Sequence, residues 1–264
     1  MELKLHEKVA IVTGGSKGIG RAIALALAQE GVDVAICARG TLALEEAAND
    51  IQSNTGSRVL ALTTDVTHQQ DVRTLIASTI AELGSVDILV NNAVNSVPGA
   101  FMELPDGAWQ DHFNVKVMGY IRCAREVIPH MKAKGWGRII NIAGDGARSL
   151  RPYAMSNGVT NAGLTNLTKN LSSHLAGDGI LVNCVHPAST MTDRLRGIFE
   201  QQTQRDGTSF EEVERNSVRD IPLGRMIKAA EIADLVLFLA SDKASAITGQ
   251  AIAVDGGIAT GIYY

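Results

Sequence analysis

Residues 9–20 join an apolar, strand-like run to a glycine cluster that opens directly into a helical pattern. The cluster reads Gly14-Gly15-Ser16-Lys17-Gly18-Ile19-Gly20, and the helical pattern continues to Glu30. Glycines permit a tight turn and a close approach of the backbone to a pyrophosphate, and N–H groups at a helix start hold negative charge. The segment therefore predicts a dinucleotide-binding turn. Because the spacing is G-x-x-x-G-x-G rather than the commoner G-x-G-x-x-G, a glycine-rich turn without a ligand is the alternative.

Strand-like and helical runs alternate along the whole chain. Strands are expected at Lys8–Val12, Val32–Ala38, Arg58–Thr64, Val86–Asn91, Gly137–Ala143, Ile180–His186 and Ala251–Asp255. Helices are expected at Ile19–Glu30, Leu42–Thr55, Gln69–Leu83, Asp106–Lys134, Pro152–Ala176 and Ala230–Ala240. This order predicts an α/β fold, a single Rossmann-like doubly wound domain over residues 1–264. Its parallel seven-stranded sheet is expected to carry helices on both faces.

Composition argues against several classes of protein. With 24 Lys plus Arg against 28 Asp plus Glu, the net charge of −4 gives no reason to expect nucleic acid. No apolar run reaches the roughly 20 residues that span a bilayer, and the N-terminus lacks the apolar core of a signal peptide. Cys37, Cys123 and Cys184 lie in apolar segments without metal-type spacing. We expect a cytoplasmic protein with reduced thiols, no metal and a small-molecule substrate.

Several motifs, in this order, resemble those of the short-chain dehydrogenase/reductase family, including its 3-oxoacyl-acyl-carrier-protein-reductase-like members. They are Thr13-Gly14-x-x-x-Gly18-x-Gly20, Asp65-Val66, Asn91-Asn92-Ala93, Asn114, Pro187 through Thr192, Ile247-Thr248-Gly249-Gln250 and Val254-Asp255-Gly256-Gly257. The resemblance covers nearly the whole chain and implies a nicotinamide dinucleotide cofactor. It implies cofactor contacts from Gly14, Ser16, Lys17, Gly18, Ile19, Gly20, Asp65, Val66, Asn92, Ala93, Pro187, Thr190 and Thr192. It also implies a homo-oligomer, a dimer or a tetramer.

The end of the second expected strand bears on the type of cofactor. An acidic residue about 20 positions beyond the glycines would bond a free ribose 2′-hydroxyl. This chain reads Ala38-Arg39-Gly40 there, without that acid. Arg39, together with Lys17, can pair with a 2′-phosphate. The charge pattern favours NADP(H), and NAD(H) stays possible.

The chain departs from the active site that the family resemblance implies. That site has a tyrosine, a lysine four residues later on one helix face, and a serine after the fifth strand. Tyr153 is the candidate tyrosine, Asn157 stands where the lysine would be, and Gly144 stands where the serine would be. With Asn114, these form the predicted catalytic set. Lys116 lies two residues beyond Asn114 and is expected to point away from it on a helix.

Substitutes for the missing groups are conceivable in the loop before Tyr153. Asp145 could act as an acid or base, and Arg148 or Arg151 as a cation near the tyrosine. The polar stretch at 190–222 is expected to be either a substrate lid at the carboxyl edge of the sheet or a solvated pair of surface helices.

The function predicted from these features is that of an NADP(H)-dependent oxidoreductase. It would reduce a carbonyl, or oxidise an alcohol, on a small molecule, with a degenerate catalytic tetrad. Two alternatives stay open: a non-catalytic NADP(H)-binding protein, and a non-redox lyase, hydrolase or isomerase that uses the same pocket.

Overall fold

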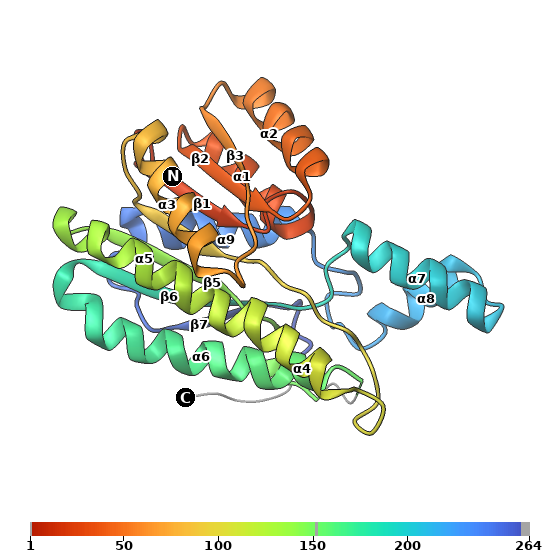
Figure 1. Cartoon of the computed structure of the whole chain (residues 1–264). Coiled ribbons are helices and arrows are strands. Elements are labelled where there is room, and N and C mark those ends of the chain that lie inside the picture. The colour runs from red at the N-terminus through yellow and green to blue at the C-terminus, as the bar shows by residue number, and fades with distance from the viewer. Residues whose placement is uncertain (1, 151–152, 260–264) are drawn as a thin grey trace.

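The computed structural model describes residues 2–150 and 153–259 (Figure 1). Within these residues, seven parallel strands form one sheet in the order β3-β2-β1-β4-β5-β6-β7. The strands are β1 (Val9–Thr13), β2 (Asp33–Ala38), β3 (Val59–Thr63), β4 (Ile88–Asn91), β5 (Gly137–Ile142), β6 (Ile180–Pro187) and β7 (Ala251–Val254). The prediction of a doubly wound α/β fold is confirmed.

Helices cover both faces of the sheet (Figure 1). On one face lie α1 (Gly18–Gln29), α2 (Thr41–Thr55) and α9 (Ala229–Ala240); on the other lie α3 (Gln69–Leu83), α5 (Gly119–Lys134) and α6 (Met155–Leu175). Successive strand side chains point to opposite faces, so Ala10 and Val12 join the first core, whereas Val9 and Ile11 join the second. Among the described residues, no helix is long and apolar enough to cross a bilayer.

The helix expected over Asp106–Lys134 is helical along its whole length, but its hydrogen-bonding pattern changes in the middle. The chain forms α4 (Asp106–His112), then a π-helix, η1 (Phe113–Met118), and then α5. A π-helix closes i→i+5 hydrogen bonds, so its residues do not keep the angular spacing of an α-helix. The helix expected from Pro152 also differs: α6 begins at Met155, Tyr153 and Ala154 precede it, and Pro152 lies outside the described residues.

The polar stretch at 190–222 contains two helices, α7 (Asp193–Asp206) and α8 (Phe210–Val218), which extend away from the sheet (Figure 1). Thr192 caps α7 through its side chain, and Ser209 caps α8 in the same way. The pair shares a small apolar cluster that includes Phe199, whose ring lies 5.9 Å from that of Phe210. Because α7 and α8 pack against each other, both expectations stay open: a substrate lid and a solvated pair of surface helices.

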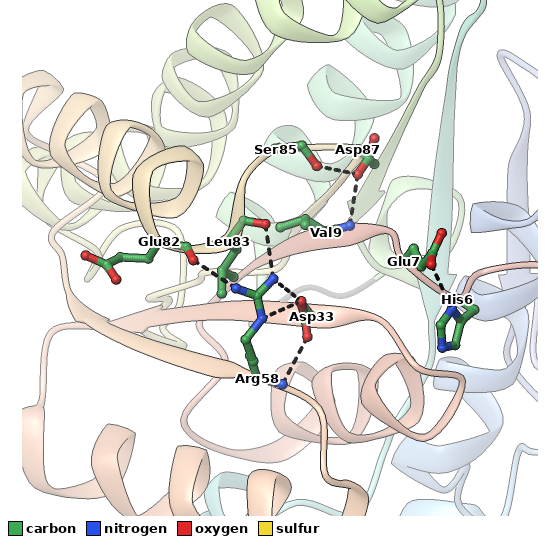
Figure 2. A network of polar contacts seen from close by, with 9 residues as sticks. All are labelled: His6, Glu7, Val9, Asp33, Arg58, Glu82, Leu83, Ser85 and Asp87. Atoms are coloured by element: carbon green, nitrogen blue, oxygen red, sulfur yellow. Dashed lines mark hydrogen bonds and ion pairs between the residues drawn. The ribbon is translucent and has the colours of Figure 1, made fainter.

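A network of polar contacts closes the amino end of the sheet (Figure 2). The Asp87 carboxylate, 1% exposed, accepts hydrogen bonds from Val9 N at 2.9 Å and Ser85 Oγ at 2.8 Å. Arg58 pairs with Asp33 at 2.5 Å and donates to two carbonyl groups at the end of α3. These contacts connect the strands at the amino end of the sheet. The carboxyl end of the sheet is therefore the end at which a binding site is expected.

Candidate active site

A cleft of about 440 Å³ opens at the carboxyl ends of β1, β2 and β4. The strand order reverses at β1, and ligands of open α/β sheets bind at such switch points. The cleft is lined by the turns and loops that follow the strands and by the start of α7. Eleven of the predicted cofactor residues line it: Gly14, Ser16, Lys17, Gly18, Ile19, Arg39, Asp65, Val66, Asn92, Ala93 and Thr192. Gly20, Pro187 and Thr190 do not.

The glycine turn is held against the end of β4. Asn92 Nδ2 donates to the carbonyl oxygens of Thr13 at 3.0 Å and Gly14 at 3.2 Å. Gly14 has a φ of +67° and Gly18 one of +55°, in the left-handed region that favours glycine. A Cβ on Gly20 would lie 2.2 Å from the Gly14 carbonyl oxygen, so this position also requires glycine. No side chain caps the amino end of α1, so its first N–H groups have no side-chain competitor for a bound anion.

The charged residues that line the cleft are Lys17, Arg39, Asp65, Asp193 and Arg194. Arg39 and Lys17 both line it, without an acidic residue at the end of β2. Asp65 follows β3, and its carboxylate accepts hydrogen bonds from Thr67 N at 2.9 Å and Thr67 Oγ1 at 2.7 Å. Burial raises the pKa of Asp65, but the Thr67 bonds and nearby positive charge outweigh it, and the net pKa is lowered. Asp65 is therefore ionised at neutral pH.

Gly144 lies directly after β5, as expected, but its neighbour on α6 is Asn161. A Cβ on Gly144 would lie 2.7 Å from Asn161 Nδ2. Asn161 is 3% exposed and stands four residues after Asn157, on the same helix. The side chain of Asn161 thus fills the space that any side chain at position 144 would enter.

Tyr153 lies elsewhere. Its side chain is 71% exposed, it does not line the cleft, and its carbonyl oxygen accepts a hydrogen bond from Gly99 N at 3.0 Å. The prediction that Tyr153 and Asn157 share one face of a helix is wrong, because α6 begins only at Met155. Neither Tyr153 nor Ala154 has the helical backbone that would align it with the later turns.

The two polar residues of η1 point in different directions. Asn114 Oδ1 accepts from Arg122 Nη2 at 2.9 Å, and Asn114 does not line the cleft. Lys116 is 4% exposed, and its Nζ donates to the carbonyl oxygen of Ala143 at 2.9 Å. As expected, Lys116 points away from Asn114, but its burial against the residue that follows β5 was not predicted. The apolar neighbours Val115 and Val117 were the sequence signal that this lysine could be buried.

Two buried histidines flank Lys116. His112 Nδ1 lies 3.0 Å from Ser156 Oγ, and His186 Nε2 lies 3.0 Å from Thr165 Oγ1. Burial, followed by the charges of Lys116 and Arg194, lowers the pKa of His112 to about 4. Burial, followed by the charges of Arg148 and Lys116, lowers the pKa of His186 to about 4. Both imidazoles are therefore neutral at pH 7.

The loop between β5 and α6 holds the expected substitutes. Arg148 Nη2 donates to the carbonyl oxygen of Ala251 in β7 at 3.3 Å. Asp145 begins a short 3-10 turn, η2 (Asp145–Ala147), and engages in an interaction of its own. Arg151 lies outside the described residues.

Fold and cleft together define a dinucleotide-binding α/β domain of the Rossmann type. The sequence model described as "Enoyl-(Acyl carrier protein) reductase" matches residues 14–259. The 3-oxoacyl-[acyl-carrier-protein] reductase FabG of Staphylococcus epidermidis is 34% identical over 251 residues, 95% of this chain and 98% of its own. The chain belongs to the short-chain dehydrogenase/reductase family.

Two further relatives are reductases linked to NADPH. The NADPH-dependent reductase BacG of Bacillus subtilis is 33% identical over 96% of this chain and 98% of its own. The L-sorbose reductase of Gluconobacter frateurii, solved with NADPH and L-sorbose, superimposes with a TM-score of 0.96 at 33% identity. That comparison covers 99% of this chain and 100% of the reductase.

Proposed function

We propose that this protein is an NADP(H)-dependent oxidoreductase that reduces a carbonyl, or oxidises the corresponding alcohol, on a small molecule. The observation that carries the proposal is the cleft at the β1–β4 switch point, with an intact glycine turn and two cations beside it. The relatives described with NADPH support the same cofactor.

The residues of the cleft fit such a cofactor. The glycine turn leaves a cradle that side chains would fill, since a Cβ on Gly14 would lie 2.9 Å from Asn92 Nδ2. The amino end of α1 would hold the pyrophosphate. Arg39 and Lys17 would hold the 2′-phosphate, and Asp65 with Val66 would face the adenine. When bound, the nicotinamide supplies or accepts a hydride.

The choice between NADP(H) and NAD(H) depends on Arg39. An NAD+-bound xylitol dehydrogenase shares the fold with a TM-score of 0.90, so the fold alone does not decide. Charge-assisted hydrogen bonds contribute about 1.5–3 kcal/mol, so Arg39→Ala is expected to weaken NADPH binding roughly 10- to 100-fold. NADH binding should change less than about threefold. Calorimetric titration of both nucleotides measures this difference, and an equal loss for both would contradict the assignment.

On α6, outside the residues that line the cleft, we assign Asn157 and Asn161 to the positions of the family's tyrosine and lysine. They stand four residues apart on α6, and Asn161 packs against Gly144, where the family's serine would be. Tyr153, on the exposed surface, is then not the proton donor. A Tyr153→Phe variant is expected to keep its rate of NADPH oxidation with any carbonyl that the wild-type protein reduces.

A second candidate is an NADP(H)-binding protein without turnover. Gly144, Asn157 and Asn161 favour it, because none of them can supply the hydroxyl, phenol or ammonium of the family's active site. NADPH oxidation measured against a panel of ketones, keto sugars and 3-oxoacyl thioesters separates the two candidates. Binding of NADPH with no oxidation across the panel would establish the second one.

A further inference from the structure

We propose that Lys116 is the proton donor of this enzyme. The proton-donating side chain would then come from η1 and not from α6. The inference rests on the proposed reductase function and concerns the group that handles the substrate's proton. Lys116 would thus take the part that the family's tyrosine plays.

The position of the ammonium group is the first support. Lys116 Nζ is hydrogen-bonded to the carbonyl oxygen of Ala143, the residue that precedes Gly144. Asn161 packs against Gly144 itself. Lys116 therefore meets the carboxyl end of β5 beside the two residues that we place in the family's catalytic positions.

Unsatisfied polar atoms around this point are the second support. An ammonium group has three N–H donors, and in the described part of the chain Nζ has one acceptor and no carboxylate partner. Asn161 Oδ1, His112 Nε2 and His186 Nδ1 are also buried without a hydrogen-bond partner there. Each such group costs about 1–3 kcal/mol if it stays unpaired. A bound molecule with a carbonyl or hydroxyl oxygen would supply partners.

The helix α6 shapes this region. Its Ser156 contacts His112, its Asn161 contacts Gly144, and its Thr165 contacts His186. The contacts lie on successive turns of α6 and reach α4, β5 and β6.

The charges that face Lys116 come from three elements besides its own. His112 on α4, and Cys184 and His186 on β6, are neutral at pH 7: burial holds both histidine pKa values near 4 and raises the pKa of the Cys184 thiol to about 11. Arg194 on α7 is the facing cation. Burial lowers the pKa of Lys116 to about 8; Cys184 acts in the opposite direction, and Arg194 lowers the pKa further. An ammonium group with that pKa is protonated at pH 7 and can release its proton.

The reaction balances with one proton from Lys116. As the carbonyl carbon accepts a hydride from the reduced nicotinamide, the π pair of the C=O bond moves to oxygen. The oxygen takes a proton from Nζ, which gives the alcohol and a neutral amine. A proton from water then restores the ammonium group. In the reverse direction the neutral amine removes the alcohol proton.

Two variants test this role. Arginine keeps the charge but has a pKa above about 12, so Lys116→Arg cannot release a proton near pH 8. Lys116→Gln removes both charge and proton. General acid catalysis typically contributes about 10²–10⁴-fold, so both variants should oxidise NADPH with a carbonyl at least about 100-fold more slowly. Their affinity for NADPH should stay within about threefold of wild type. The matched control, Lys243→Gln, replaces an exposed lysine and should change neither.

A second readout does not depend on turnover. In protein labelled with ¹³C-lysine, one Cε signal should titrate near pH 8 and be missing from Lys116→Gln. The wild-type rate of reduction should fall above the same pH, whereas the residual rate of Lys116→Arg should not. A Lys116 signal that titrates above pH 10, or a Lys116→Arg variant with the wild-type rate, would overturn the role of Lys116 and leave the proposed function intact. A wild-type protein that oxidises no NADPH across the carbonyl panel would overturn the proposed function, and the role with it.

Discussion

Replacing Lys116 by methionine should stabilise the folded protein at neutral pH. The variant removes a positive charge from a side chain that is 4% exposed and keeps an unbranched chain of similar length. Removing a buried cation that has no carboxylate partner among residues 2–150 and 153–259 relieves its desolvation. The same change removes the hydrogen bond from Nζ to Ala143, which opposes the gain.

The size of the effect follows from the pKa of Lys116. Its value in the folded protein is about 8, against 10.5 for an ordinary lysine. At about 1.36 kcal/mol per pKa unit, the charged form costs the folded state roughly 3 kcal/mol at pH 7. Loss of the hydrogen bond to Ala143 destabilises the variant by about 1 kcal/mol. Lys116→Met should therefore be more stable than the wild type by roughly 2 kcal/mol.

The dependence on pH has a definite sign. Because the folded pKa is lowered, the unfolded chain binds more protons between about pH 8 and pH 10.5, and the wild-type protein gains stability as the pH rises through that window. The variant lacks this gain. Its advantage should therefore shrink by roughly 2 kcal/mol between pH 7 and pH 9.5.

Urea denaturation followed by circular dichroism, at both pH values and one protein concentration, measures this change. Comparing variant with wild type at each pH cancels the titration of other groups. Lys243→Met, at an exposed position, is the matched control and should show no difference that depends on pH. An advantage of Lys116→Met that stays constant within about 0.5 kcal/mol would refute a buried, perturbed lysine.

Three further predictions concern the glycine turn, the amino end of the sheet and the thiols. Gly20→Ala should abolish NADPH binding in calorimetry, because its Cβ would lie 2.2 Å from the Gly14 carbonyl oxygen. Gly163→Ala, on an open face of α6, should instead raise stability by about 0.5–1 kcal/mol and leave binding unchanged. Asp87→Ala should lower the free energy of unfolding by about 3 kcal/mol in urea, since Val9 N and Lys134 lose their partner; a loss below about 1 kcal/mol would contradict this. All three cysteines are buried and free, so a thiol reagent should label them in urea and not in the native protein at pH 8.

The sequence predicted those parts of the site that depend on one segment at a time. The glycine turn follows β1 and opens α1, as the spacing of Gly14, Gly18 and Gly20 indicated. Arg39 lies at the cleft because it ends a strand, and the ends of parallel strands meet at one edge of the sheet. These features follow from local pattern and from the general rules of βαβ connection.

The predictions that depended on helix register were less successful. The pairing of Tyr153 with Asn157 assumed a helix that begins at Pro152, whereas α6 begins at Met155. The burial of Lys116 against Ala143 was not predicted, nor was the π-helical hydrogen bonding of residues 113–118. Helix starts and π-helical turns depend on the packing of neighbouring elements, which a single sequence does not specify.

The sequence by itself determined the doubly wound fold, the place of the cleft and the positive charge beside it. Periodicity, glycine spacing and strand order are properties of the chain that need no knowledge of distant contacts. Only the tertiary structure decided that Lys116 meets Ala143 across 27 residues and that Asn161 fills the space beside Gly144. The burial of a charge, and hence its pKa, is set by the elements that close around it after folding.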